Sequence, residues 1–295
     1  MDRRTWVALG VTATIGLAGA VPAVAAPLRA AERPPGTAAA SVDRVLPPNF
    51  VSGCAYSHSR PDDPIVFPGQ PGASHLHDFF ANTTTSATST EASLRVGGTT
   101  CRRRLDTAAY WAPALTDGGR TVRPSRVAAY YQPAGKDPAS IRPFPADLRM
   151  VAGPGPGSAE FLCAGRPRTV TPATASAPTC PGGQDLVIRI FFPDCWDGRN
   201  LDSADHRSHM AYNTGGQCPA GHPVPVPRLR LGFHYSGADG GPDVALSSGP
   251  PSTAHADFFN TWNQPELERL VAGCLNTGVH CGGRGPDRFR PAATR

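Results

Sequence analysis

The stretch PRLRLGFHYS, residues 227–236, alternates apolar and polar side chains along almost its whole length. The apolar positions are Leu229, Leu231, Phe233 and Tyr235, and the polar ones are Arg228, Arg230 and His234. Because successive side chains of a strand point to opposite faces, this alternation predicts a β-strand with one buried face.

Neighbouring stretches predict further strands. DLVIRIFFPDCW (185–196) holds a continuous apolar run, Leu186 to Phe192, which is typical of a buried central strand and is ended by Pro193. Residues 108–133 contain two aromatic and β-branched runs around the turn sequence TDGG (116–119), which predicts a hairpin. The 32 glycines and 33 prolines are scattered among apolar segments and suit many short strands joined by tight turns.

One helix is predicted, near the C-terminus, in NQPELERLVAGCLNTG (263–278). Its apolar residues Leu267, Leu270, Val271 and Cys274 recur at helical spacing. Asn263 or Gln264 can cap its start, and Gly278 can end it. We therefore predict a mainly β fold, a single sandwich or jelly-roll-like domain with a C-terminal amphipathic helix.

The N-terminus predicts export. Arg3 and Arg4 precede an apolar stretch, and Ala23 and Ala25 form an A-x-A site, as in a Sec-type signal peptide over residues 1–25. That apolar stretch is shorter than the ~20 residues of a membrane span, so we expect no membrane span in the mature chain and a secreted, extracellular protein. We expect a flexible Ala/Pro linker at 26–46, one β-rich domain at 47–283 and a disordered tail at 284–295.

Eight cysteines, an even number, agree with an oxidising compartment and predict disulfides. Pairing each cysteine with its nearest neighbour in the sequence is the simplest choice. It gives Cys54–Cys101, Cys163–Cys180, Cys195–Cys218 and Cys274–Cys281. A structural zinc site built from cysteines is disfavoured because no C-x-x-C occurs.

The charge pattern predicts no nucleic-acid partner. The net charge of +5 comes almost entirely from arginine, since Lys136 is the only lysine. The basic residues are dispersed and form no RNP, zinc-finger or helix-turn-helix pattern.

Histidines and acids gather in four short clusters: HLHD (75–78), DHRSH (205–209), FHY (233–235) and HAD (255–257). In an extended segment His75 and His77 lie on one face about 6.5–7 Å apart, so both can point into one cavity. Imidazole is the commonest metal ligand and titrates near neutrality, which makes one divalent metal ion a candidate cofactor. The candidate ligands are His75, His77, His206, His209 and His255, and the candidate catalytic residues are His77, Asp78, Asp205, His209, His234 and Asp257. In the alternative interpretation, these histidines and aspartates only cap loops and fill the core.

Four phrases together resemble one known family: FVSGCAYSH…DPIVFPGQPGASHLHDFFANTTT, FFPDCWDGRNLDSADHRSHMAY, CPAGHPVPVPRLRLGFHY and HADFFNTWNQPELERLVAGC. The family is DUF1996, secreted proteins of unknown function from actinobacteria and filamentous fungi, and the resemblance covers about residues 47–283. In fungi the domain sometimes accompanies WSC modules, which are associated with cell walls and carbohydrate. The resemblance therefore implies an extracellular, polysaccharide-facing role, and it supplies no catalytic residues.

Two functions follow as expectations. The first is a hydrolase or lyase that acts on extracellular or cell-wall polysaccharide, with Arg228, Arg230 and Trp262 binding the substrate and the histidine–acid clusters lining a cleft. The second is a non-catalytic glycan- or cell-wall-binding module whose histidines are structural.

Overall fold

The computed structural model describes residues 47–165 and 169–282. The predicted signal peptide (1–25), linker (26–46) and tail (284–295) lie outside the described residues. Within the described residues, no helix is both long and apolar enough to span a membrane.

Strands dominate the described chain. They are β1 (Asn49–Arg60), β2 (His77–Ala81), β3 (Ala109–Pro113), β4 (Leu115–Asp117), β5 (Arg120–Val122), β6 (Arg126–Gln132), β7 (Arg149–Ala152), β8 (Ala159–Gly165), β9 (Thr169–Val170), β10 (Asp185–Phe191), β11 (Cys195–Trp196), β12 (Met210–Ala211), β13 (Val224–Pro225), β14 (Arg228–Tyr235), β15 (Val244–Leu246), β16 (Ala256–Phe259) and β17 (His280–Cys281). The helices are α1 (Glu91–Arg95) and α2 (Gln264–Leu270), and 3-10 turns occur at Pro138–Ser140 and Pro251–Thr253.

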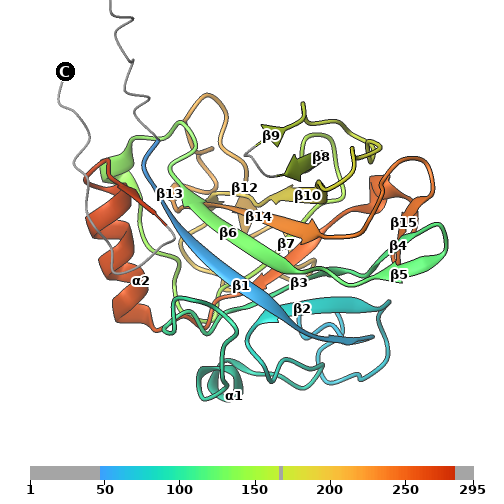
Figure 1. The fold of residues 1–295 in the computed structure, drawn as a ribbon. Coiled ribbons are helices and arrows are strands. Elements are labelled where there is room, and N and C mark those ends of the chain that lie inside the picture. The colour runs from blue at the N-terminus through green and yellow to red at the C-terminus, as the bar shows by residue number, and fades with distance from the viewer. Residues whose placement is uncertain (1–46, 166–168, 283–295) are drawn as a thin grey trace, which may run out of the picture. The chain divides into compact units, whose positions relative to one another are not determined.

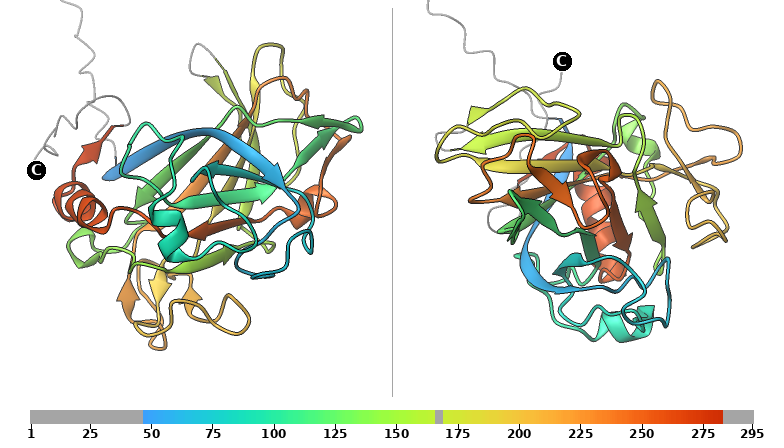
Figure 2. Two further views of the ribbon diagram at one scale, coloured as in Figure 1. Left: turned by 90° about the horizontal axis from the view of Figure 1, so that it is seen from below. Right: turned by 90° about the vertical axis from the view of Figure 1, so that its right-hand side faces the viewer.

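One large antiparallel sheet curls into a half-barrel in the order β7-β16-β3-β2-β1-β6-β14-β10-β8-β9, and β17 joins β1 in parallel (Figures 1 and 2). Two small sheets, β12-β11-β13 and β15-β4-β5, flank it. The predicted mainly β fold is confirmed, and its main core lies on the inner face of one curled sheet. The predicted hairpin is confirmed as well, because Gly118 and Gly119 join β4 to β5 with positive φ angles.

The alternating stretch 227–236 becomes β14, which pairs with β6 on one side and β10 on the other. Leu229, Leu231, Phe233 and Tyr235 are buried in the main core, as predicted from the pattern. The predicted central strand, now β10, also lies inside the sheet, between β14 and β8.

The C-terminal helix forms where predicted. The side chain of Asn263 caps α2 by accepting the backbone N–H of Glu266 (3.2 Å). A π-helical turn at Val271–Leu275 follows and buries Cys274, which bonds Cys281. All four predicted disulfides are confirmed, and each can stabilise the domain by about 2–4 kcal/mol.

The β7-β16-β3-β2 part of the sheet is packed on both faces. Phe80, Tyr110 and Phe258 belong to the main core on the inner face. Phe79, Trp111 and Phe259 belong to a second core with Ile65 and with Leu94 of α1. Since side chains two apart in a strand share a face, His77 lies with Phe79, and Asp257 lies with Phe259, on this outer face.

Candidate metal centre

Three histidine rings meet at the edge of the second core. His77 begins β2, His75 precedes it by two residues, and His255 precedes β16. The ring centroids of His75 and His77 are 4.2 Å apart, and that of His255 lies 5.0 Å from His75 and 5.8 Å from His77. One nitrogen of each ring lies within 4.8 Å of the others. The structure thus joins HLHD to HAD across almost 180 residues of sequence.

Two carboxylates lie against the same rings. Oxygen atoms of Asp63 and Asp257 and a nitrogen of His77 are all within 4.8 Å of one another. Asp257 was a candidate from the sequence, whereas Asp63 was not. The signal that could have identified it is the pair Asp62-Asp63 between two prolines (RPDDP), because aspartate in such a turn folds back onto its own backbone.

Backbone groups orient the side chains of this set. His77 Nδ1 donates to the carbonyl of Asp62 (2.9 Å), and His255 Nδ1 donates to the carbonyl of Thr253 (2.8 Å). Asp63 Oδ1 accepts the backbone N–H groups of Ile65 and Val66, both at 2.9 Å. Metal-binding histidines usually donate their other ring N–H in this way, which fixes the tautomer and leaves Nε2 as the ligand atom.

Four polar atoms of the cluster lack hydrogen-bond partners. Within the described residues, Nε2 of His75, Nε2 of His77 and both carboxylate oxygens of Asp257 are buried without a hydrogen bond. A buried polar group without a partner costs about 1–3 kcal/mol, and a charged group costs more. Four such atoms in one cluster, all with lone pairs to donate, indicate a site that binds a metal ion.

The electrostatics agree with this interpretation. Burial, and then the neighbouring His75, holds the pKa of His77 well below its usual value, and burial lowers the pKa of His255 to about 4. Burial, and then Asp63, raises the pKa of Asp257 well above its usual value. The imidazoles are therefore neutral at pH 7, as metal ligands must be, and Asp257 is a carboxyl group that a cation would stabilise in its ionised form.

The donor set fits a divalent transition metal. A tetrahedral ion with bonds of about 2.0–2.1 Å holds its donor atoms roughly 3.3 Å apart, so small side-chain movements bring these atoms into range. Imidazole with carboxylate suits zinc or iron better than calcium or magnesium, which prefer oxygen ligands alone. Cys54, Cys101 and Asp106 also lie close together, but the two cysteines form a disulfide and are not metal ligands.

The DHRSH cluster lies outside the ligand set. Nδ1 of His206 donates to the carboxylate of Asp202 (2.9 Å), and Nε2 of His209 donates to the carbonyl of Arg149 (2.7 Å). Asp205 accepts the backbone N–H groups of Arg207 and Ser208. These hydrogen bonds are sufficient to explain His209 and Asp205 as residues that shape and anchor a loop.

The remaining candidates are in other places. Asp78 lies on the inner face of β2, where its carboxylate accepts Ser59 Oγ (2.6 Å) and where burial raises its pKa to about 6. Trp262 is buried in the main core and donates to Tyr131 Oη (2.9 Å). On the polar face of β14, Arg228 pairs with Asp194, Arg230 stacks on Tyr130, and His234 contacts Arg126 and Asp185. The structure does not place these five residues among the metal-centre atoms.

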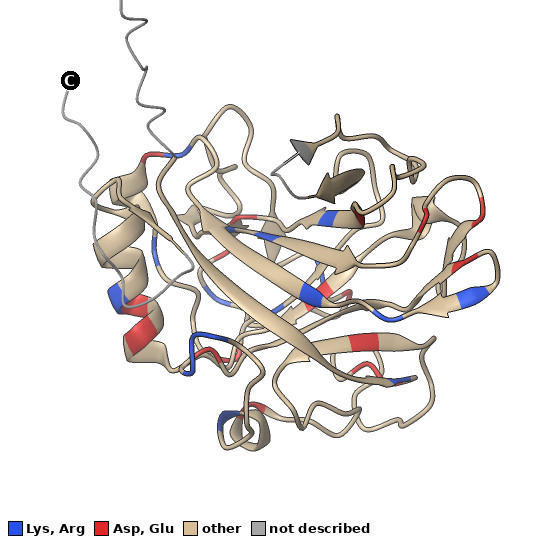
Figure 3. Cartoon of the chain, viewed as in Figure 1, with Lys and Arg blue, Asp and Glu red and all other residues tan. Residues whose placement is uncertain are grey.

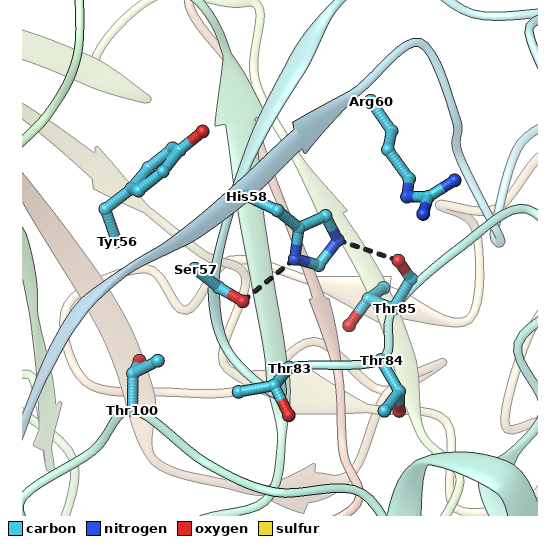
Figure 4. A pocket seen from close by; sticks show the side chains of 8 residues that line it. All are labelled: Tyr56, Ser57, His58, Arg60, Thr83, Thr84, Thr85 and Thr100. Carbon is cyan, nitrogen blue, oxygen red and sulfur yellow. Dashed lines mark hydrogen bonds between the residues drawn. The ribbon is translucent and has the colours of Figure 1, made fainter.

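A separate hollow of about 350 Å³ is lined by residues of β1 and of the segment after β2 (Figure 4). Its lining carries mainly hydroxyl groups, with one imidazole and one guanidinium: Tyr56, Ser57, His58, Arg60, Thr83, Thr84, Thr85 and Thr100. His58 donates to the carbonyl of Thr85 and accepts Ser57 Oγ, both at 2.8 Å, and its ring stacks on Phe79. Both ring nitrogens are thus occupied, and the hollow contains no residue of the metal centre.

Charged residues elsewhere are scattered over many strands and loops (Figure 3). A family model described as "Domain of unknown function (DUF1996)" matches residues 63–262, a range that includes all five residues of the metal centre. No curated protein and no solved structure matches the chain.

Proposed function

The chain belongs to the DUF1996 family, whose function is unknown, and we propose that this protein is a secreted metal-dependent enzyme. The observation that carries the proposal is the convergence of three imidazoles and two carboxylates whose inward-facing atoms are mostly buried without partners. Such an arrangement makes little sense as core packing, because buried polar groups in a folded protein are normally hydrogen-bonded.

In this proposal, His75, His77, His255 and Asp257 bind one divalent ion. A bound divalent ion would polarise the substrate and activate water near neutral pH. Asp63 is held by two backbone N–H groups on Oδ1, so its carboxylate is fixed beside His77 and can accept a proton from the attacking water. Burial raises the pKa of Asp63, which brings this group closer to the range of a general base.

The substrate can approach from one side. His77 and Asp257 form a fully buried floor, whereas His75 and His255 are partly exposed. A catalytic ion needs an open coordination position as well as its protein ligands, so with these four ligands the ion would have to take a fifth position. We propose that this position lies on the side of His75 and His255, the two half-buried ligands.

We propose that the substrate is extracellular or cell-wall polysaccharide, cleaved by hydrolysis or elimination. Four disulfides suggest an extracellular protein, and the predicted Sec-type signal peptide supports export. Polysaccharides are abundant substrates outside the cell, and the resemblance to DUF1996 proteins also implies a polysaccharide-facing role.

The second candidate is a non-catalytic glycan- or wall-binding module in which the histidines hold a structural ion. The complete burial of His77 and Asp257 favours it, because structural sites are closed. The partial exposure of His75 and His255 favours catalysis. Metal binding is common to both candidates, so activity must decide between them.

The test begins with the purified mature protein and elemental analysis by mass spectrometry. We expect one equivalent of a transition metal, and we expect activity on a panel of plant, fungal and bacterial polysaccharides that is lost on chelation and restored by the metal. His77→Ala should abolish both metal and activity, and His234→Asn, a histidine outside the centre, should preserve both. Metal without activity on any substrate would favour the structural ion, and absence of metal from the folded protein would overturn the proposal.

A further inference from the structure

The hollow between β1 and the segment after β2 has the size of a small-molecule site. Its volume of about 350 Å³ lies within the range of about 300–1,000 Å³ that such sites occupy. In the view of Figure 4, Tyr56 and Arg60 lie on opposite sides of His58, and the threonines lie below its ring. The hollow is therefore a second candidate site, built from residues other than those of the metal centre.

A β-bulge in β1 shapes one wall of the hollow. Tyr56 lies opposite Phe80 of β2 and His58 lies opposite Phe79, so Ser57 has no partner on β2. A bulge of this kind re-aims the side chains around the extra residue. The ring of Tyr56 meets Phe80 edge-on, and that of His58 stacks on Phe79. Three successive residues of β1 consequently line the same hollow.

Two hydroxyl groups of this wall donate their protons within the protein. His58 Nε2 donates to a backbone carbonyl (2.8 Å), so its Nδ1 accepts, and Ser57 Oγ donates to it (2.8 Å). Tyr56 Oη donates to Ser59 Oγ (2.7 Å), because the proton of Ser59 goes to Asp78. The oxygens of Ser57 and Tyr56 therefore offer only lone pairs to a ligand.

The other lining groups complete the pattern. Thr84 Oγ1 donates to Asn82 Oδ1 (2.9 Å), so this oxygen also has only lone pairs left. Arg60 is exposed, and its guanidinium, which can only donate, makes no hydrogen bond or ion pair to a described residue. Thr85 is 1% exposed, and its Oγ1 has no hydrogen-bond partner in the described chain. A buried hydroxyl group normally has a partner, so Thr85 indicates a ligand.

The hollow and the metal centre are neighbours along β1 and β2. Arg60 lies directly opposite His77, and His58 lies opposite Phe79, two residues further along β2. Residues that face each other across an antiparallel pair have Cβ atoms about 4.5–5.5 Å apart. A polymer that reaches the metal centre can therefore also reach the hollow.

We propose that the hollow binds one sugar ring of the polysaccharide substrate. Sugar hydroxyl groups donate to the lone pairs of Tyr56, Ser57 and Thr84 and accept from Arg60. An oxyanion would bring its own lone pairs against those three oxygens, so the ring is a neutral one. The inference rests on the proposed function for the identity of the substrate, whereas binding in the hollow needs no metal ion.

The test is calorimetric titration of the purified mature protein with cellohexaose, mannohexaose, chitohexaose and inorganic phosphate. We expect a neutral oligosaccharide to bind, with affinity about tenfold or more lower in Arg60→Ala and about threefold or more lower in Thr85→Val. Thr85→Val should not lower the free energy of unfolding, because the hydroxyl it removes has no partner in the protein. Thr88→Val, which changes an exposed threonine outside the hollow, is the matched control and should bind like the wild type.

Metal content, measured on the same samples, separates the two proposals. Absence of oligosaccharide binding, or equal affinity in the wild type, Arg60→Ala and Thr85→Val, would overturn this inference and leave a metal-loaded centre intact. Phosphate binding that depends on Arg60, without sugar binding, would overturn it as well. A wild-type protein that holds no metal but binds a sugar through Arg60 and Thr85 would instead overturn the proposed catalysis and leave the sugar site standing.

Discussion

Two buried polar clusters on different parts of the sheet are satisfied to very different degrees. Asp194 is fully buried, and its carboxylate accepts hydrogen bonds from Lys136 Nζ, from Arg228 (3.2 Å) and from the backbone and side chain of Asn213 (2.9 and 2.6 Å). Asp257 is equally buried, and both its oxygens lack a hydrogen-bond partner within the described residues. The carboxylate of Asp194 therefore has all the hydrogen-bond donors it needs within the protein, whereas that of Asp257 has none.

The difference separates structure from function. A carboxylate with four donors and two cations around it is a closed structural unit, and it explains why the only lysine of the chain, Lys136, is buried. The carboxyl group of Asp257 lies among neutral imidazoles and beside another carboxyl group, so its ionised form is unfavourable unless a cation is bound next to it. Removing residues from each cluster should therefore have opposite consequences.

The largest effect is expected from the metal centre. Asp257→Asn or His77→Ala removes a ligand, and we expect metal affinity to fall by more than about 100-fold, since even residues that only orient ligands contribute 10–100-fold. Metal stoichiometry by mass spectrometry and circular dichroism of the folded protein measure this. The matched control is His209→Gln, which changes a buried histidine outside the ligand set. Retention of metal in both ligand variants would contradict the assignment.

The next largest effect is expected in the Asp194 cluster, where a substitution should lower stability and leave metal binding intact. Asp194→Ala leaves Lys136 and Arg228 without their shared carboxylate, and we expect a loss of about 3–5 kcal/mol in the free energy of unfolding. Metal stoichiometry should stay unchanged. In the metal-free protein, Asp257→Asn should cost nothing, because no hydrogen bond is lost. Urea denaturation of both variants makes the comparison, and equal losses would remove the distinction between the two clusters.

A third buried carboxylate, Asp106, lies between these extremes. Tyr110 Oη donates to it (2.9 Å), yet burial raises its pKa to about 7. The folded state therefore binds a proton that the unfolded chain releases near pH 4, so this residue makes stability fall as pH rises from about 4 to about 7. The difference amounts to at most about 4 kcal/mol.

Asp106→Asn should remove that part of the pH dependence. Urea unfolding of the wild type and the variant at about pH 4.5 and about pH 8 should show the two curves diverging at the lower pH, where the wild type keeps its protonated carboxyl. A parallel shift at both values would mean that Asp106 is ionised throughout.

The sequence predicted the parts of this molecule that depend on local patterns. Alternation in 227–236 gave β14, the spacing in 263–278 gave α2, and each cysteine paired with its nearest neighbour in the sequence. The two-residue spacing of His75 and His77 brought their rings together. For β14, α2 and the histidine pair the responsible residues are close together in the sequence, whereas the cysteine partners are 7 to 47 residues apart and were predicted from their order along the chain.

The sequence could not show which clusters meet. His255 reaches His75 because β16 and β2 both pair with β3, and no local pattern contains that pairing. Asp63 was missed because its role depends on a loop that folds over the sheet. Asp78 was chosen for its neighbour His77, yet successive residues of a strand face opposite sides, and the alternation therefore separates them.

The smallest predicted effect tests the polar face of β14, where the sequence favoured Arg230 as a substrate-binding residue. Arg230 lies 4.2 Å from the ring centre of Tyr130, and burial lowers its pKa, so the guanidinium already has an aromatic partner. We expect Arg230→Gln to lose about 0.5–1 kcal/mol of stability through this contact and to leave metal content and activity unchanged. If Arg230→Gln instead abolished activity while the metal was retained, the substrate would lie over β14, and the side of the metal centre formed by His75 and His255 would not be the binding face.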